Sequence, residues 1–333
     1  MKVLFIGGTG NISTPVSQLA IERDVDLYHL NRGNHPSIHG VTGLCADIGD
    51  RKQVKEVLAN HDWDVVVNWI AYTPEDIQRD VALFEGSTRQ YIFISSASAY
   101  QKPPENHIIT ESTPLRNPVW DYSRNKIACE DLLVKLYRER GFPMTIVRPS
   151  HTYNSVIPVS LGGWDEFTVV ERMRKGLPVV VHGDGTSLWT MTHATDFAKG
   201  FIGLMNNPHA TGESFHITSD EVLTWDRIYK AVAQAAGGVA DLVHIASESI
   251  SDYADQHQYP SVRGTLLGDK SHSAIFDNAK IKRFVPGFQA TIPFAEGIRQ
   301  TIDWFDADPA RKIINEQTNR FLNGLIQTYK PII

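Results

Sequence analysis

A glycine-rich turn near the amino terminus limits the possible folds of this chain more than any other feature. It occupies 7–13, after a short apolar run at 2–7 that is typical of a strand and before a stretch at 13–23 with helical apolar spacing. A strand, a glycine turn and a helix in this order predict a βαβ unit that binds a dinucleotide, although a plain strand-to-helix connection is the alternative. The pyrophosphate would lie at the start of the helix. The residues expected to approach it are Gly7, Gly10, Asn11 and Ile12.

Up to about residue 150, short apolar runs alternate with helical stretches, as in a parallel sheet built from βαβ units. The expected strands cover 2–7, 26–30, 64–70, 90–95 and 144–148. The expected helices cover 13–23, 51–60, 74–84 and 122–138. Several strands are apolar without alternation, which indicates helices on both faces of the sheet. The fold class is therefore α/β, a doubly wound, Rossmann-type parallel sheet.

The regular alternation weakens beyond residue 150. A strand is expected at 179–181, and helices at 225–236 and 294–305. This pattern predicts a smaller carboxyl-terminal lobe that binds the substrate. We expect a nucleotide-binding domain at 1–152, completed by parts of 190–218, and a lobe formed mostly by 153–333.

Composition excludes several classes of protein. The 333 residues are 42% hydrophobic, with a formal charge of -6 and no block of like charges, so we expect a globular protein without a nucleic acid partner. Cys45 and Cys129 stand in no metal-ligand spacing, so we expect no metal site and interpret both as buried packing residues of a protein in a reducing compartment. The apolar run at 3–6 is too short for a membrane span or a signal peptide, which predicts a cytoplasmic protein without a membrane partner.

The end of the second expected strand bears on the choice of cofactor. NAD-preferring proteins place an acid there to hold the ribose, whereas this chain has Asn31 and Arg32. A guanidinium pairs well with a phosphate, so NADP or NAD is expected, with NADP favoured, unless Arg32 is an ordinary loop arginine. Asp47, beside Ile48, is expected to accept from the adenine amino group; the alternative is that it caps the next helix.

A tyrosine and a lysine at helical spacing form the candidate catalytic pair. Tyr122 and Lys126 are four positions apart, which places them on one face of a helix. A free tyrosine has a pKa of about 10 and needs a nearby cation to exchange protons at neutral pH, and Lys126 would supply one. A chance pairing on the surface is the alternative.

The hydroxyl-rich end of the strand at 90–95, with the letters S-S-A-S-A-Y at 95–100, joins this pair in a recognisable set. Together they resemble the extended short-chain dehydrogenase/reductases, the NAD-dependent epimerase/dehydratase family, over nearly the whole chain. The resemblance implies that Ser96 holds the substrate oxygen, with Ser98 as the alternative. It also implies that Tyr122 is the acid/base and that Lys126 binds the nicotinamide ribose. Further residues assigned to the cofactor site are Ala71 and Pro149.

The sequence offers several candidates for the substrate end of the site. His151 follows Arg148-Pro149 and could face the substrate, although a lone histidine is more often structural. Trp120 and Trp164 are candidates for the pocket wall or for general packing. His193 and Asp196, in T-H-A-T-D-F-A, resemble a family motif that links the lobes.

Two departures from the family pattern narrow the function. Ala97 and Ser98 stand where dehydratases of the family carry an Asp-Glu pair. Trp189 stands where nucleotide-sugar epimerases carry a diphosphate-binding arginine, so Trp189 is expected to line a pocket for a smaller ligand unless Arg263 or Lys270 replaces the missing cation.

The sequence therefore predicts an NAD(P)-dependent oxidoreductase or epimerase. It would act on a hydroxyl or carbonyl of a small polar, sugar-like substrate, and the resemblance suggests a homodimer. The alternative is a nucleotide-sensing or RNA-binding protein without catalysis. Phe215–Ser219 and Thr224-Trp225 resemble a divergent branch that contains chloroplast stem-loop RNA-binding proteins.

Overall fold

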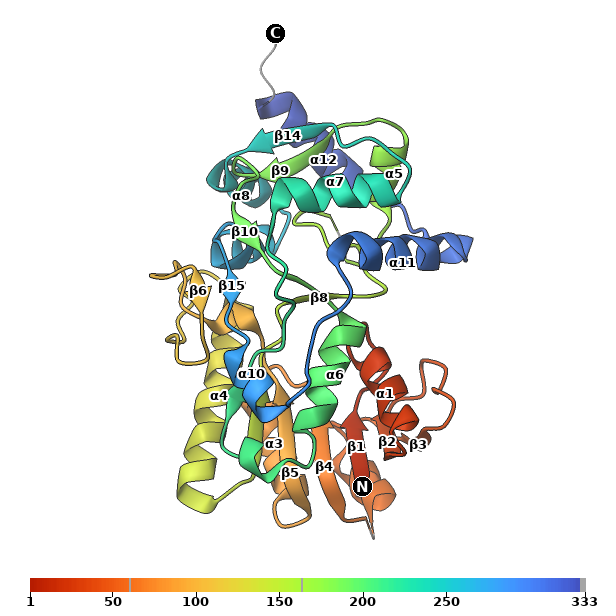
Figure 1. The fold of residues 1–333 in the computed structure, drawn as a ribbon, viewed down its shortest axis with the longest axis vertical. Helices are drawn as coiled ribbons and strands as arrows, with labels where there is room; N and C mark the ends of the chain where they lie inside the picture. Colours follow the sequence, from red (N-terminus) through yellow and green to blue (C-terminus); the bar gives the residue numbers. More distant parts are fainter. Residues whose placement is uncertain (60, 163, 330–333) are drawn as a thin grey trace.

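A parallel sheet of seven strands forms the centre of the protein (Figure 1). The computed structural model describes residues 1–59, 61–162 and 164–329. The strand order is β12-β7-β5-β4-β1-β2-β3, and every pairing is parallel, which confirms the predicted α/β, doubly wound fold. The strands are β1 (Lys2–Ile6), β2 (Asp26–Asn31), β3 (Thr42–Cys45), β4 (Trp63–Asn68), β5 (Thr88–Ile94), β7 (Met144–Val147) and β12 (Ser214–Phe215).

Helices cover both faces of this sheet. One face carries α1 (Ser13–Glu22) and α6 (Ala194–Leu204), whose apolar side chains share a buried cluster with β1 and β4. The other face carries α2 (Arg51–Leu58), α3 (Pro74–Phe84) and α4 (Asp121–Arg140). The helix expected at 51–60 ends at Leu58, and its last expected residue, Asn60, lies outside the described residues.

The sheet has a reversal of strand order that positions the site. From β1 the chain continues to β2 and β3 on one side, then crosses to β4 and β5 on the other. The loops after β1 and β4 therefore diverge at the carboxyl edge, which leaves a crevice of the kind where such sheets bind ligands.

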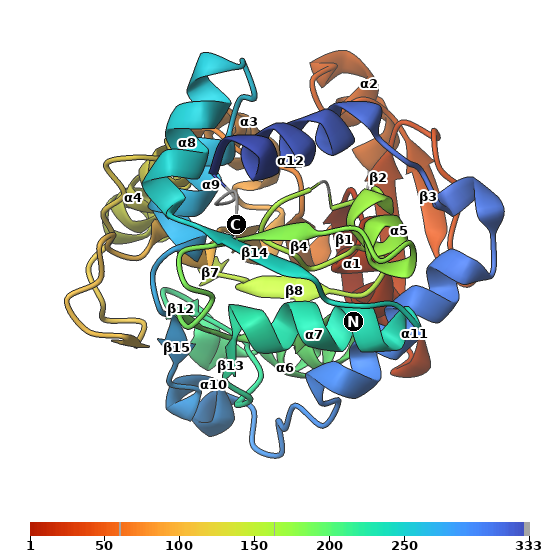
Figure 2. The ribbon, with the colours of Figure 1, turned by 90° about the horizontal axis from the view of Figure 1, so that it is seen from above.

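The lobe covers the carboxyl edge of the sheet, as the view from above shows (Figure 2). It contains four pairs of short strands: β8 (His151–Tyr153) with β11 (Met191–His193), β9 (Val179–His182) with β14 (Leu242–Ile245), β10 (Leu188–Trp189) with β13 (Leu223–Thr224), and β6 (Ile108–Ile109) with β15 (Ile275–Phe276). The remaining helices are α5 (Thr168–Arg174), α7 (Trp225–Ala235), α8 (Ser247–Gln256), α9 (Val262–Thr265), α10 (Ala279–Phe284), α11 (Phe294–Asp306) and α12 (Glu316–Tyr329). Short helical turns are η1 (Ala97–Ala99), η2 (Pro208–Ala210), η3 (Leu266–Lys270) and η4 (Pro309–Arg311).

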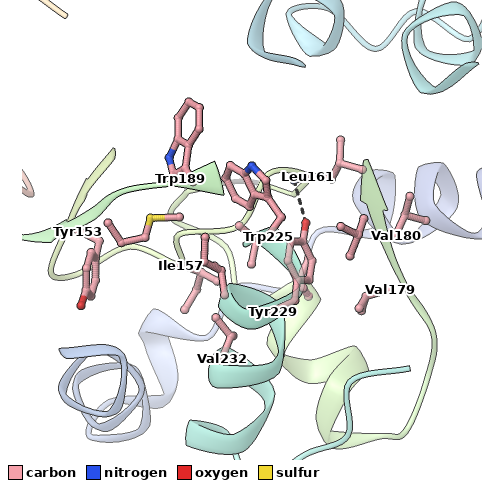
Figure 3. Packing of buried hydrophobic residues seen from close by; sticks show 14 of the residues in the cluster. Tyr153, Ile157, Leu161, Val179, Val180, Trp189, Trp225, Tyr229 and Val232 are labelled. Atoms are coloured by element: carbon pink, nitrogen blue, oxygen red, sulfur yellow. Dashed lines mark hydrogen bonds between the residues drawn. The ribbon is translucent and has the colours of Figure 1, made fainter. Parts of the chain in front are cut away.

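Helix α7 organises the core of the lobe (Figure 3). Its buried side chains at Trp225, Tyr229 and Val232 pack with Val180 of β9 and Trp189 of β10. The Trp225 and Trp189 rings lie 5.4 Å apart, centroid to centroid. This packing fixes Trp189 at the side of the lobe that faces the sheet.

The two cysteines, both expected to be buried, differ in the structure. Cys129 is buried on α4, as expected, but Cys45 is exposed because it ends β3, the edge strand of the sheet. None of the described helices has the length and apolar character needed to cross a bilayer.

Candidate active site

A cavity of about 1210 Å³ lies between the carboxyl edge of the sheet and the lobe. Its wall contains all but one of the residues assigned to the site from the sequence. These are Gly7, Gly10, Asn11, Ile12, Asn31, Arg32, Asp47, Ile48, Ser96, Ser98, Tyr122, Lys126, Pro149, His151 and Trp189. The exception, Ala71, is buried behind the wall.

The glycine turn lies flat against β2. Gly7 and Gly8 have φ angles of +93° and +108°, which favour glycine, and the Gly7 N–H donates to the Leu30 carbonyl over 2.9 Å. A Cβ on Gly8 would lie 2.6 Å from the His29 ring, which is itself held by Ser17 at 3.0 Å. The turn therefore needs glycine at position 8 for space as well as for conformation. The sequence alone did not reveal the contact between Gly8 and His29.

Asn11 joins the turn to the lobe. Its Nδ2 donates to the Thr152 carbonyl over 2.9 Å, and its Oδ1 accepts from the Ser155 N–H over 3.1 Å. The Asn11 amide is thus engaged by the protein. The start of α1 carries no capping side chain, so its N–H groups suit an anion such as a pyrophosphate.

Arg32 and Asp47 line the end of the cavity beside β2 and β3, where we expect the adenosine half of the cofactor. Arg32 is exposed and makes no ion pair among the described residues. Asp47 accepts from the Gly49 N–H over 2.9 Å. The alternative role of Asp47 as a helix cap is wrong, because Asp50 accepts from the first N–H groups of α2.

Lys126 reaches the cavity from α4 and is buried. Its Nζ donates to the carbonyls of Ala71 at 2.7 Å and Ile94 at 2.8 Å. The Ala71 loop is shaped in turn by Asn68, whose Oδ1 accepts from the N–H groups of Ile70 and Ala71, both over 2.8 Å. Burial lowers the pKa of Lys126 to about 8, against the effect of nearby acidic groups.

Tyr122 lies one turn before Lys126, with its ring centroid 5.7 Å from Nζ. Burial raises the pKa of Tyr122, and Tyr72 adds to the effect, while a hydrogen bond with Ser96 opposes it. The pKa of Tyr122 is therefore raised overall, and burial outweighs the lowering that we expect from Lys126, whose Nζ already donates to two carbonyls.

Three serine hydroxyls form a row beside Tyr122. Ser123 on α4 donates to Ser98 over 2.7 Å, and Ser98 lies 2.9 Å from Ser96, which bonds to Tyr122. Ser98 is therefore held between two serines, and Ser96 is the one nearest the phenol. The sequence analysis did not predict a role for Ser123, although its position directly after Tyr122 indicates that it lies near the site.

The lobe end of the cavity is walled by aromatic rings. His151, Trp164 and Trp189 all line it, with the His151 ring 4.6 Å from Trp164 and 6.4 Å from Trp189. Nε2 of His151 and Nε1 of Trp189 are buried and have no partner among the described residues. Burial, with a contribution from Lys270, keeps the pKa of His151 well below its usual value, so the ring is neutral. Trp120 also lines the cavity and contacts the Tyr122 ring at 4.8 Å.

Several cavity residues come from loops and short elements whose contribution the sequence did not indicate. They are Trp69, Tyr72, Asp165, Thr265, Asp269, Lys270 and Phe276, of which only Lys270 is predicted from the sequence, as a replacement cation. Arg263, the other cation considered, lies outside the lining and pairs with Asp252 and Asp255, each at 2.6 Å. No group of acidic, histidine or cysteine side chains in the described ranges could hold a metal ion.

The motif expected to link the lobes does so through Asp196. This buried carboxylate accepts from the N–H groups of Thr291 at 3.0 Å and Ile292 at 2.8 Å, in the segment that leads to α11. His193 caps α6, with Nδ1 accepting from Thr195 at 3.4 Å. Neither residue lines the cavity.

A doubly wound sheet with a glycine turn, and a helix that carries tyrosine and lysine into the same cavity, define an enzyme of the nucleotide-dependent oxidoreductase class. Residues 3–218 match the family described as the NAD dependent epimerase/dehydratase family, and the chain belongs to that family.

Individual relatives are more distant. The chain is 25% identical to the chloroplast stem-loop binding protein of 41 kDa b of Arabidopsis thaliana, over 100% of this chain and 85% of that protein. It is 22% identical to the 2'-dehydrokanamycin reductase of Streptomyces kanamyceticus, over 87% of this chain and 80% of that protein. The solved structure of the UDP-glucose 4-epimerase of Thermus thermophilus in complex with NAD shares the fold. Its TM-score is 0.70 at 20% identity, over 92% of this chain and 99% of that one.

Proposed function

We propose that the protein is an NAD(P)-dependent oxidoreductase or epimerase that acts on a hydroxyl or carbonyl of a small polar, sugar-like substrate. The observation that carries this proposal is the meeting of Ser96, Tyr122 and Lys126 with the glycine turn in one cavity. The relative named 2'-dehydrokanamycin reductase supports the same class of reaction.

The residues present fit a dinucleotide. The uncapped start of α1 suits its pyrophosphate, Arg32 and Asp47 suit its adenosine half, and Lys126 suits the ribose beside the nicotinamide. A bound nicotinamide would supply or accept the hydride.

Tyr122 would exchange the proton at the substrate oxygen. Because burial raises its pKa, the phenol is protonated at neutral pH and is ready to act as an acid on a carbonyl. Ser96, held by Ser98 and hydrogen-bonded to Tyr122, would position that oxygen. In the oxidative direction the phenol must lose its proton, and the Lys126 ammonium would stabilise the phenolate from the same helix face.

Dehydration receives less support than redox chemistry. Elimination of water needs an acid and a base beside the oxidised sugar, and the two positions after Ser96 are Ala97 and Ser98. Neither side chain can serve as a base at neutral pH.

Tyr122→Phe tests the proposal. We expect turnover to fall about 10²- to 10⁴-fold because the transferable proton is lost. The dissociation constant of the cofactor should stay the same, since the ring is retained. Consumption of the reduced cofactor would be followed by absorbance with a panel of ketosugars, and cofactor binding by calorimetry.

The matched control is Tyr137→Phe. Tyr137 lies on the same helix but outside the cavity lining, so this variant should keep the activity of the unmodified protein. A Tyr122→Phe enzyme that keeps most of its turnover would contradict the assigned role.

A second candidate is RNA binding, favoured by the 25% identity with the chloroplast stem-loop binding protein along the whole chain. The net charge of -6 and the assembled set around Tyr122 favour the enzyme instead. We expect no salt-sensitive RNA complex in filter-binding measurements with a stem-loop RNA at increasing salt. Tight binding at physiological salt that survives Lys126→Ala would favour the second candidate.

A further inference from the structure

We propose that Lys270 binds a single anionic group of the substrate, a carboxylate or a phosphate, against the tryptophan wall of the cavity. This inference rests on the proposed function because it assigns the substrate end of the same site. It narrows the substrate class to polyhydroxylated compounds with one acidic group.

The backbone at Lys270 is firmly anchored. Its carbonyl accepts from Trp225 Nε1 at 3.1 Å and lies 2.9 Å from Nε2 of His182, two buried rings from α7 and β9. Lys270 is the last residue of η3, which is a π-helical turn. This conformation is rare and is often found at functional sites. The side chain therefore reaches the cavity from a fixed position.

The ammonium group of Lys270 has no ion-pair partner among the described residues. Lys270 is 8% exposed, and its Nζ makes no hydrogen bond or ion pair within the part of the chain that the structure describes. The adjacent carboxylate, Asp269, pairs with Lys102 instead, at 3.3 Å. A buried cation without a partner is costly, and an anion from the ligand would remove that cost.

Other charges near this end do not replace Lys270. Lys126 already serves two carbonyls, and Arg32 and His35 line the adenosine half. His151 and His182 face Lys270, and their pKa values are lowered by burial, with Lys270 adding to the effect, so they carry no charge near neutral pH.

Burial lowers the pKa of Lys270 as well, and Asp269 only partly opposes this. A bound anion would favour the charged form and so draw a proton to the amine. Beside it, the unpartnered Trp189 Nε1 offers one donor, and His151 Nε2 one further hydrogen-bonding atom. One cation and two ring nitrogens suit one acidic group with neighbouring hydroxyls better than a diphosphate.

Calorimetry on the cofactor-loaded, full-length protein tests this proposal. The probes are glucuronate, glucose 6-phosphate and neutral glucose. We expect at least one anionic probe to bind about 10- to 100-fold more tightly than glucose. The comparison of glucuronate with glucose 6-phosphate shows which acidic group is preferred.

Lys270→Met should remove this preference and leave glucose binding unchanged. Lys270→Gln keeps a polar side chain of similar length and serves if the methionine variant folds poorly. The matched control is Arg263→Met, which removes one positive charge from the lobe outside the cavity.

Two outcomes overturn the proposal. One is that neither anionic probe binds better than glucose at concentrations up to about 10 mM. The other is that both lysine variants keep the preference. Because binding is measured without turnover, Tyr122→Phe should retain the preference for the anionic probe. A failure of the redox proposal is therefore distinguishable from a failure of the proposal for Lys270.

Discussion

Arg32 is the residue on which we expect cofactor choice to depend. It stands in the wall of the cavity at the end of β2, exposed and without an ion pair among the described residues. Asn31, just before it, uses its Oδ1 to accept from the Gly33 N–H at 2.9 Å, so no carboxylate at this strand end opposes a ribose phosphate. The local charge therefore favours NADP.

Arg32→Ser should weaken NADP binding about tenfold and leave NAD binding nearly unchanged. A charge-assisted contact contributes about 1.5 to 3 kcal/mol, and screening at an exposed site places the effect at the lower end. Fluorescence titration with both cofactors measures it. Arg23→Ser, at the end of α1 and outside the cavity lining, is the control with the same loss of charge. Equal affinities of the unmodified protein for the two cofactors would refute the preference.

The sequence predicted some residues of the candidate site and missed others. Tyr122 and Lys126 were found because a spacing of four has a fixed meaning on a helix. Lys270 and Asp269 reach the same cavity only because η3 packs onto α7 and β9, a tertiary contact that no local pattern encodes. The lining of the cavity around the glycine turn and α4 was therefore predictable from local patterns, and the lining at the lobe only in part.

At the scale of elements, α4, which carries the proposed catalytic pair, is fixed to the sheet by a buried carboxylate. Its buried Glu130 pairs with Arg148, which follows β7, at 2.6 Å and accepts from Ser95, which follows β5. The helix is thereby fixed to the ends of two neighbouring strands. Arg148 itself lies outside the cavity lining and acts through this ion pair.

The central strands were predictable, and the edge strands were not. β1, β4 and β5 are continuous apolar runs because helices cover both of their faces. β3, with the sequence TGLC, is short and largely exposed at one edge. β12 has two residues and joins the opposite edge from far along the chain, so its position depends on pairing with β7.

At the scale of the whole molecule, buried neutral histidines make stability depend on pH. Burial lowers the pKa of five of them: His29, His151, His182, His193 and His216. For His29 and His182 the value falls to about 4. The unfolded chain takes up protons near pH 6.5, whereas these folded histidines do not until about pH 4.

The free energy of unfolding should therefore decrease as the pH falls from about 6.5 to about 4, by up to about 1.4 kcal/mol per pH unit for each such histidine. Asp80 and Asp131, whose pKa values burial raises, act in the opposite sense but are fewer. Urea unfolding at several pH values measures the slope.

His29→Gln should reduce that slope, and His209→Gln, at an exposed histidine, should not. Equal slopes for the unmodified protein and the His29 variant would show that His29 is protonated alike in the folded and unfolded states.

The contact between Gly8 and His29 also constrains how this chain can evolve. A Cβ at position 8 would meet the imidazole at 2.6 Å, and a side chain there would also have to adopt a φ of +108°. A smaller residue at position 29 would remove the first obstacle but not the second. Descendants of this chain are therefore expected to keep glycine at position 8 whatever residue they carry at position 29.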